Sequence, residues 1–227
     1  MTYGVDADPS LAAQDPGELF DIVRADGTPT GRTKRRASVH RDGDWHRSLH
    51  VWIIGLDPVG REVVTFQRRG RHKDTHPLKL DATVGGHYRA GERLAETLRE
   101  TVEEIGRVVE ERELIFAGVR QAAWEDQLVR DREIQDVFLV RDDRPLTSLR
   151  PNPDELDALV RIEIAGVIDL YGGAVSTVEG SQVVATTMAA SRRAIRLSDF
   201  VPTADRYPLK IALAARAHLR GEPVIAV

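Results

Sequence analysis

The segment GGHYRAGERLAETLRETVEEIGRVV, residues 85–109, is the part of the sequence that decides the fold. Apolar residues recur near helical spacing between Leu94 and Ile105, and Gly106 is a typical helix stop, so the pattern predicts a helix over residues 93–105. Three carboxylates at positions i, i+3 and i+4 project from one side of such a helix. They belong to Glu100, Glu103 and Glu104. Such a run is typical of a solvated helix face, but carboxylate oxygens are also the ligands that Mg²⁺ and Mn²⁺ prefer.

The residues around this helix resemble the Nudix box. In that motif Gly is followed after five residues by Glu, after seven more by Arg-Glu, after two by Glu-Glu and after one by Gly. The matching residues are Gly86, Glu92, Arg99, Glu100, Glu103, Glu104 and Gly106. The interval between Glu92 and Arg99 is six residues rather than seven, and in the family this first glutamate helps to fix the loop against the helix. The resemblance implies the α/β Nudix fold, in which a mixed β-sheet is sandwiched between helices.

The same resemblance implies a chemistry. Nudix enzymes hold Mg²⁺, or Mn²⁺ in its place, on a small molecule that contains a diphosphate, and they cleave the diphosphate linkage by water attack on phosphorus. Carried over to this chain, the metal ligands and catalytic groups are Glu100, Glu103 and Glu104, with Glu103 favoured as the general base. Gly85 and Gly86 are expected to let the backbone approach the phosphates closely.

Histidines add a second resemblance, which runs from about residue 18 to about residue 170. The stretches SVHRDGDWHRSLHVWI and GGH look like the Nudix branch related to isopentenyl-diphosphate isomerase. In those isomerases three histidines and two acidic residues hold a metal. The resemblance places this possible second metal site at His40, His46, His87, Asp131 and Glu133. The alternative is that these histidines bind substrate through hydrogen bonds or brace the loop.

The isomerase reaction lacks a principal group in this chain. The isomerases move protons on carbon with a cysteine where this sequence has Gly85, and the chain contains no cysteine. Because glycine cannot transfer a proton, hydrolysis is predicted on an isomerase-like scaffold. Isomerisation and a non-catalytic ligand-binding module, which the short box favours, remain the alternatives.

Basic residues supply candidate phosphate contacts. Arg68 and Arg69 end a predicted core strand, and strand alternation sends them to opposite faces, so one of the two is expected to bind the diphosphate. The cluster over residues 32–36 fits either substrate contact or a solvated sheet edge. Trp124 fits either the border of the ligand site or simple packing.

The remaining patterns organise the chain around this centre. Apolar and β-branched runs predict strands over residues 19–23, 49–56, 61–69, 113–124 and 133–142. The first of these, followed by an Asp-Gly turn, begins an N-terminal β-hairpin. Two alanine-rich stretches of helical period are expected to be helices, over residues 183–197 and 207–221. We therefore expect a flexible tail over residues 1–17, the Nudix domain over residues 18–172 and a helical C-terminal extension over residues 173–227.

Composition narrows the function classes. The 227 residues carry a net charge of −4, which argues against general nucleic-acid binding. The absence of cysteine excludes disulfides, zinc–thiolate sites and a cysteine nucleophile. Apolar runs are too short to cross a membrane, and the start of the chain lacks a secretion signal. The expectation is a cytoplasmic protein whose partner is a small-molecule diphosphate, and which forms a homodimer.

Overall fold

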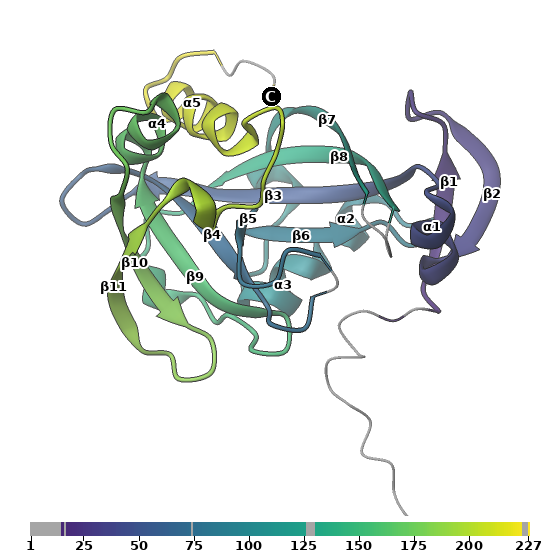
Figure 1. The fold of residues 1–227 in the computed structure, drawn as a ribbon, viewed down its shortest axis with the longest axis horizontal. Coiled ribbons are helices and arrows are strands. Elements are labelled where there is room, and N and C mark those ends of the chain that lie inside the picture. The colour runs from purple at the N-terminus through teal and green to yellow at the C-terminus, as the bar shows by residue number, and fades with distance from the viewer. Residues whose placement is uncertain (1–14, 16, 74, 126–129, 224–226) are drawn as a thin grey trace, which may run out of the picture.

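A computed structural model describes residues 15, 17–73, 75–125, 130–223 and 227, so most of the predicted tail lies outside the described residues. The described part has the predicted mixed α/β fold, which is drawn in Figure 1. The predicted N-terminal hairpin is a two-stranded sheet of β1 (Leu19–Val23) and β2 (Pro29–Arg35). The strands of the main sheet are β3 (His46–Leu56), β4 (Glu62–Arg69), β5 (Leu80–Asp81), β6 (Val84–His87), β7 (Ile115–Glu125), β8 (Arg130–Arg141), β9 (Leu156–Glu163), β10 (Val178–Val184) and β11 (Ala190–Ile195). The α-helices are α1 (Arg36–Asp42), α2 (Leu94–Thr97), α3 (Arg99–Ile105), α4 (Ile164–Gly172) and α5 (Tyr207–Leu219).

The main sheet forks between β3 and β4, which pair over only part of their length. Its order is β11-β10-β9-β4-β3-β8-β7, with β3 and β8 parallel and the other pairs of this path antiparallel. β3 pairs with β4 only from Ile53 to Leu56; its earlier residues pair instead with β6, while the end of β4 pairs with β5. The two strands therefore diverge beyond this short pairing, and β5 and β6 lie between them.

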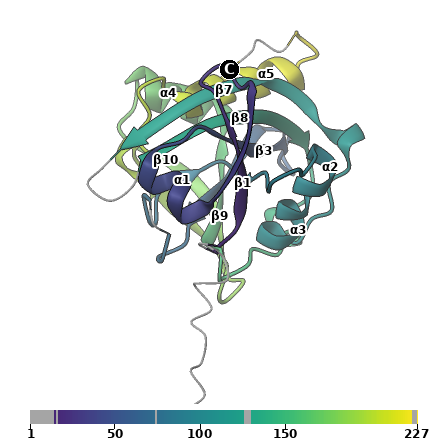
Figure 2. The ribbon, with the colours of Figure 1, turned by 90° about the vertical axis from the view of Figure 1, so that its right-hand side faces the viewer.

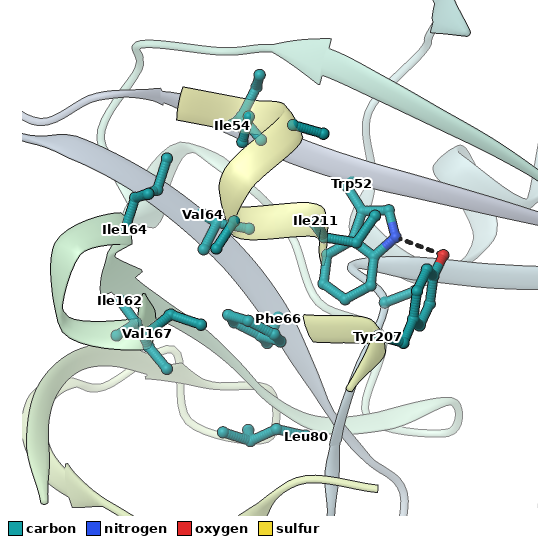
Figure 3. Packing of buried hydrophobic residues seen from close by; sticks show 14 of the residues in the cluster. Trp52, Ile54, Val64, Phe66, Leu80, Ile162, Ile164, Val167, Tyr207 and Ile211 are labelled. Atoms are coloured by element: carbon teal, nitrogen blue, oxygen red, sulfur yellow. Dashed lines mark hydrogen bonds between the residues drawn. The ribbon is translucent and has the colours of Figure 1, made fainter. Parts of the chain in front are cut away.

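Alternation along β3 directs successive side chains to two different cores. Trp52 and Ile54 belong to the core that α4 and α5 cover, and Figure 3 shows Trp52 there beside Phe66 and Tyr207. Leu49 and Ile53 belong to the core on the other face, which receives apolar residues of α3 and of the turn before it. The sheet is therefore sandwiched between helices, as predicted (Figure 1).

The sequence-based helix over residues 93–105 is confirmed, although the structure divides it into α2 and α3 at Leu98. The helix α1 was not among the helices predicted from the sequence. α1 and the β1–β2 hairpin face the viewer in Figure 2. α5 confirms the expected helix near the C-terminus. No helix among the described residues is long and apolar enough to cross a membrane.

The expectation of a helix over residues 183–197 is wrong. These residues include the end of β10, the turn that follows it and all of β11; β10 and β11 are antiparallel, and β10 also pairs with β9. Alanine favours a helix locally, but pairing with the exposed edge of β9 outweighs that preference. The C-terminal extension thus continues the main sheet before α5 returns to cover it.

Candidate functional site

A cavity of about 800 Å³ lies at the fork of the sheet. α3 supplies acidic residues to its wall, β6 supplies the glycines and His87, and β3 and β8 supply polar side chains. The segment over residues 201–207, just before and at the start of α5, closes another side. The cavity therefore joins residues that the sequence placed in two separate candidate sites.

The glutamate cluster, defined as Glu100, Glu103 and Glu104, lines this cavity in three different environments. Glu104 is 2% exposed, and its Oε2 atom accepts hydrogen bonds from Gln67 Nε2 at 3.2 Å and from the Gly85 amide at 3.3 Å. Burial raises the pKa of Glu104 well above its usual range. Burial also raises the pKa of Glu100 to about 7, against the opposing charge of Arg99. The Glu103 side chain is 49% exposed and is open to water.

The short interval in the box leaves its supporting contacts in place. Arg99 Nη1 donates to Glu92 Oε1 at 2.7 Å, and Arg99 Nη2 lies 2.9 Å from Glu100 Oε1. Glu92 Oε2 accepts from the Arg89 amide at 2.9 Å and from Thr97 Oγ1 at 3.2 Å. Glu92 thus ties the loop to the helix although only six residues separate it from Arg99.

The two glycines of the turn have different neighbours. A Cβ atom on Gly86 would lie 2.3 Å from Glu100 Cγ, so glycine is what allows this glutamate to approach the strand. A Cβ atom on Gly85 would make only ordinary contact with His50, at 3.6 Å from its Cδ2. Steric crowding therefore requires glycine at position 86 and not at position 85.

The histidine–carboxylate cluster comprises the five residues of the possible second metal site, and the structure brings them together. They come from α1, β3, β6 and β8 and are His40, His46, His87, Asp131 and Glu133. Among the described residues, two sets of three have ligand atoms within 4.8 Å of one another. These sets are His40, His46 and His87, and His46, Asp131 and Glu133. The three members of the glutamate cluster do not form such a set.

Three buried polar atoms of this cluster have no hydrogen-bond partner among the described residues, namely His40 Nε2, His46 Nε2 and Asp131 Oδ1. They lie close together: Asp131 Oδ1 is 3.9 Å from His40 Nε2 and 3.7 Å from His46 Nε2. His46 Nδ1 lies 3.1 Å from the Asp44 carbonyl, which can only accept, so His46 Nε2 carries a free lone pair. Leaving buried polar atoms unpaired is costly, and a bound ligand could satisfy all three of these atoms.

The charges of the cluster favour a cation. Burial lowers the pKa of His40 to about 3 and of His87 to about 4, so both imidazoles are neutral, the form that binds metals. Although burial opposes it, the hydrogen bond from His87 brings the pKa of Glu133 well below its usual range. Burial and the charge of Glu133 raise the pKa of Asp131. Nitrogen and carboxylate donors in this combination suit a divalent transition metal.

His87 is the exception within the cluster. Arg36 Nη1 lies 3.2 Å from His87 Nδ1, and a guanidinium can only donate, so Nδ1 accepts. The proton of the neutral ring is then on Nε2, which donates to Glu133 Oε1 at 3.0 Å. In this arrangement His87 orients Glu133, and the nitrogen atoms open to a cation are those of His40 and His46.

Of the two candidate arginines, Arg69 lines the cavity and Arg68 does not. Arg69 donates from Nη1 to Asp81 Oδ2 and from Nε to the Thr75 carbonyl, each at 2.9 Å. Arg68 instead pairs with Asp157. Strand alternation separates the two side chains as expected, and Arg69 is the one that faces the cavity. Trp124 also borders the cavity, with its ring 4.8 Å from that of His76.

Several cavity residues were not among the sequence-based candidates. Ser48 and His50 share the face of β3 that carries His46 and Trp52, so period-two alternation could have revealed them. His50 Nδ1 lies 3.1 Å from the Tyr207 hydroxyl, to which Trp52 Nε1 donates at 2.9 Å (Figure 3 draws the second bond). Tyr207 is more than 150 residues away in sequence from both, and no local signal connects them.

Comparison with known proteins places this chain in a family. The family model described as NUDIX domain matches residues 46–172. Nudix hydrolase 3 of Arabidopsis thaliana is 35% identical over 153 residues, which span 66% of this chain and 19% of that protein. An uncharacterized Nudix hydrolase of Clostridium acetobutylicum is 32% identical over 147 residues, 65% of this chain and 70% of the relative. A solved Nudix hydrolase of Alicyclobacillus acidocaldarius is 13% identical, with a TM-score of 0.48 over 78% of this chain and 96% of that one.

Proposed function

This chain belongs to the Nudix family, and on that premise we propose that it is a divalent-metal-dependent hydrolase of a diphosphate linkage. The substrate class is a nucleoside diphosphate or another compound in which a diphosphate carries a second group. The observation that supports this most is the single cavity at the fork. There, the buried Glu104 and the half-buried Glu100 lie beside the glycine turn, and four of the five residues of the histidine–carboxylate cluster line the same cavity.

We assign the residues of the cavity separate roles in metal binding, proton transfer and phosphate binding. The glutamate cluster is proposed to hold Mg²⁺ or Mn²⁺, which when bound neutralises phosphate charge and acidifies water. Glu104 is buried, Glu100 is half-buried and Glu103 is the most exposed of the three, so we assign Glu103 the role of general base. Gly85 and Gly86 line the cavity at the proposed phosphate site, and Arg69 is assigned the role of binding a phosphate oxygen.

We further propose that the histidine–carboxylate cluster holds a second divalent cation. The unpartnered atoms of His40, His46 and Asp131 support this role, since all three are buried and Asp131 Oδ1 lies 3.9 and 3.7 Å from the two histidine nitrogens. The bond from His46 Nδ1 to the Asp44 carbonyl fixes the ring in the orientation that a ligand needs.

Substitutions in the glutamate cluster test the main proposal. Glu103→Gln and Glu104→Gln each remove one negative charge with little change in shape, and we expect each to lower kcat/KM by at least about 100-fold. The matched control is Glu111→Gln, which changes an exposed glutamate outside the cavity. The main proposal fails if both cluster variants turn over substrate as fast as the control.

Isopentenyl-diphosphate isomerisation is the second candidate, and the assembled histidine–carboxylate cluster is the observation that favours it. Gly85 argues against it, because it stands where the isomerases place a cysteine and carries no proton. Deuterium exchange into isopentenyl diphosphate would favour the isomerase, and its absence would leave hydrolysis. The short box no longer favours a non-catalytic module, because the contact between Glu92 and Arg99 is intact.

A further inference from the structure

A chain of hydrogen bonds begins in the segment that precedes α5. Asp205 holds Arg120 of β7 with two contacts, from Nε to Oδ2 at 2.9 Å and from Nη2 to Oδ1 at 3.1 Å. The guanidinium also lies 4.2 Å from the centre of the Tyr207 ring. Arg120 is only 12% exposed, so its orientation is set by these two residues of the C-terminal extension.

The chain continues through a buried amide on β8. Arg120 Nη1 donates to Gln135 Oε1 at 2.7 Å, and Gln135 Nε2 donates to Glu133 Oε2 at 2.5 Å. The guanidinium can only donate and an ionised carboxylate can only accept, so both ends fix the same orientation of the amide. Gln135 is 4% exposed, and water does not compete strongly for these bonds.

The far end of the chain is a member of the histidine–carboxylate cluster. Glu133 Oε2 accepts from Gln135 and from Ser48 Oγ, the latter at 2.9 Å. With this oxygen occupied, Oε1 is directed to His87 and lies 4.0 Å from His46 Nε2. The contacts of Oε2 therefore orient the carboxylate, while Oε1 is the oxygen nearer to the unpartnered nitrogen of His46.

We propose that Asp205 and Arg120, acting through Gln135, are positioning residues for Glu133. Docking of the segment before α5 then sets the affinity of the histidine–carboxylate cluster for a divalent cation. This inference rests on the proposed metal role of that cluster. It assigns the C-terminal extension a part in the site although the extension supplies no residue to the cluster itself.

Outer partners of a metal site commonly change its affinity by about 10- to 100-fold, because they hold a ligand in the orientation that the cation requires. Asp205→Ala removes the first acceptor of this hydrogen-bond chain. Gln135→Leu removes the amide in the middle of it and replaces it with a side chain of similar volume. Each is expected to weaken cation binding by about 10-fold or more. Both substitutions break the same hydrogen-bond chain. The double variant should therefore bind the cation no more weakly than whichever single variant has the lower affinity.

The experiment titrates tag-free protein with Co²⁺ and follows the visible d–d absorption of the bound ion. His46→Ala identifies which part of the absorption belongs to the cluster, since the glutamate cluster has no imidazole. The matched control is Glu62→Ala, which removes two contacts of Arg220, at 2.7 and 3.0 Å. That pair ties the end of α5 to β4 but has no link to Glu133. Thermal unfolding of each variant shows that it remains folded.

The expected result is a weaker Co²⁺ affinity for Asp205→Ala and Gln135→Leu, non-additive effects in the double variant, and wild-type affinity for Glu62→Ala. Unchanged affinity in Asp205→Ala, additive losses, or an equal loss in Glu62→Ala would overturn the positioning role while leaving the metal site in place. If the wild type shows no absorption that depends on His46, both the metal role of the cluster and this inference fail. The hydrolase proposal, which depends on the glutamate cluster, survives either result.

Discussion

Gly86 and Gly85 are neighbours in one strand, yet only Gly86 lies so close to a side chain that an added methyl group would clash with it. A methyl group at position 86 would meet Glu100 Cγ at 2.3 Å, whereas one at position 85 would meet His50 at 3.6 Å. We expect Gly86→Ala to lower the free energy of unfolding by about 1–3 kcal/mol and Gly85→Ala to change it by less than about 1 kcal/mol. Urea denaturation of the two variants measures this difference. Equal effects would show that Glu100 is not held against the strand.

Glu100 also predicts a pH dependence for the metal-free protein. Burial raises its pKa from 4.5 to about 7, with Arg99 opposing this shift and Glu103 adding to it. The neutral carboxyl is favoured in the folded state, so its contribution to stability is complete below pH 4.5. It is lost as the pH rises through 7.

The wild type loses on the order of 3 kcal/mol of its free energy of unfolding in this way, because each unit of pKa shift corresponds to about 1.36 kcal/mol. Glu100→Gln should remove this loss, so the variant gains stability relative to the wild type between pH 5 and pH 8. Unfolding in EDTA at these two values provides the measurement. Parallel pH profiles for the two proteins would contradict the burial of an ionisable group at this position.

At the scale of elements, the C-terminal extension is part of the core rather than an addition to it. β10 extends the sheet beside β9, and the extension contributes buried Ile195, Phe200 and Tyr207. A chain that ends at residue 172 would expose the edge of β9 and the face that α5 covers. We expect it to be insoluble or to unfold without a cooperative transition.

Circular dichroism and thermal unfolding of the shortened chain provide the test. Tyr207→Phe is the milder comparison, because it removes only the hydroxyl that Trp52 and His50 contact. It should cost about 1–3 kcal/mol and leave the fold intact. Cooperative unfolding of the shortened chain would instead support an independent domain over residues 18–172.

Elements with strong local patterns could be predicted from the sequence, and the others could not. The runs that became β3, β4, β7 and β8 alternate or are densely apolar, and the pattern of α3 is helical in period. α1 is short and polar, and residues 183–197 form strands only because β9 offers an edge. In both places a distant partner decides the structure, and the local sequence does not record it.

At the scale of the whole molecule, the site at the fork combines residues that are close in sequence with contacts that only folding creates. For this reason the candidate site could be predicted only in part. The box residues lie close together in sequence, and the histidine–carboxylate cluster was reached through a family resemblance. The link from Asp205 to Glu133 joins β7, β8 and the extension, and it exists only in the folded chain. Sequence spacing gives no access to such a contact.

The most direct test of the central claim is a mass-spectrometric assay in ¹⁸O-labelled water. Purified protein with Mg²⁺ would be mixed with a pool of nucleoside diphosphates, dinucleotides, sugar nucleotides, coenzyme A and isopentenyl diphosphate. A Glu103→Gln, Glu104→Gln double variant would be run beside it. We predict that the wild type alone cleaves a diphosphate compound and that ¹⁸O enters a phosphate-containing product. Loss of no compound, equal cleavage by the double variant, or conversion of isopentenyl to dimethylallyl diphosphate without the label would contradict the account.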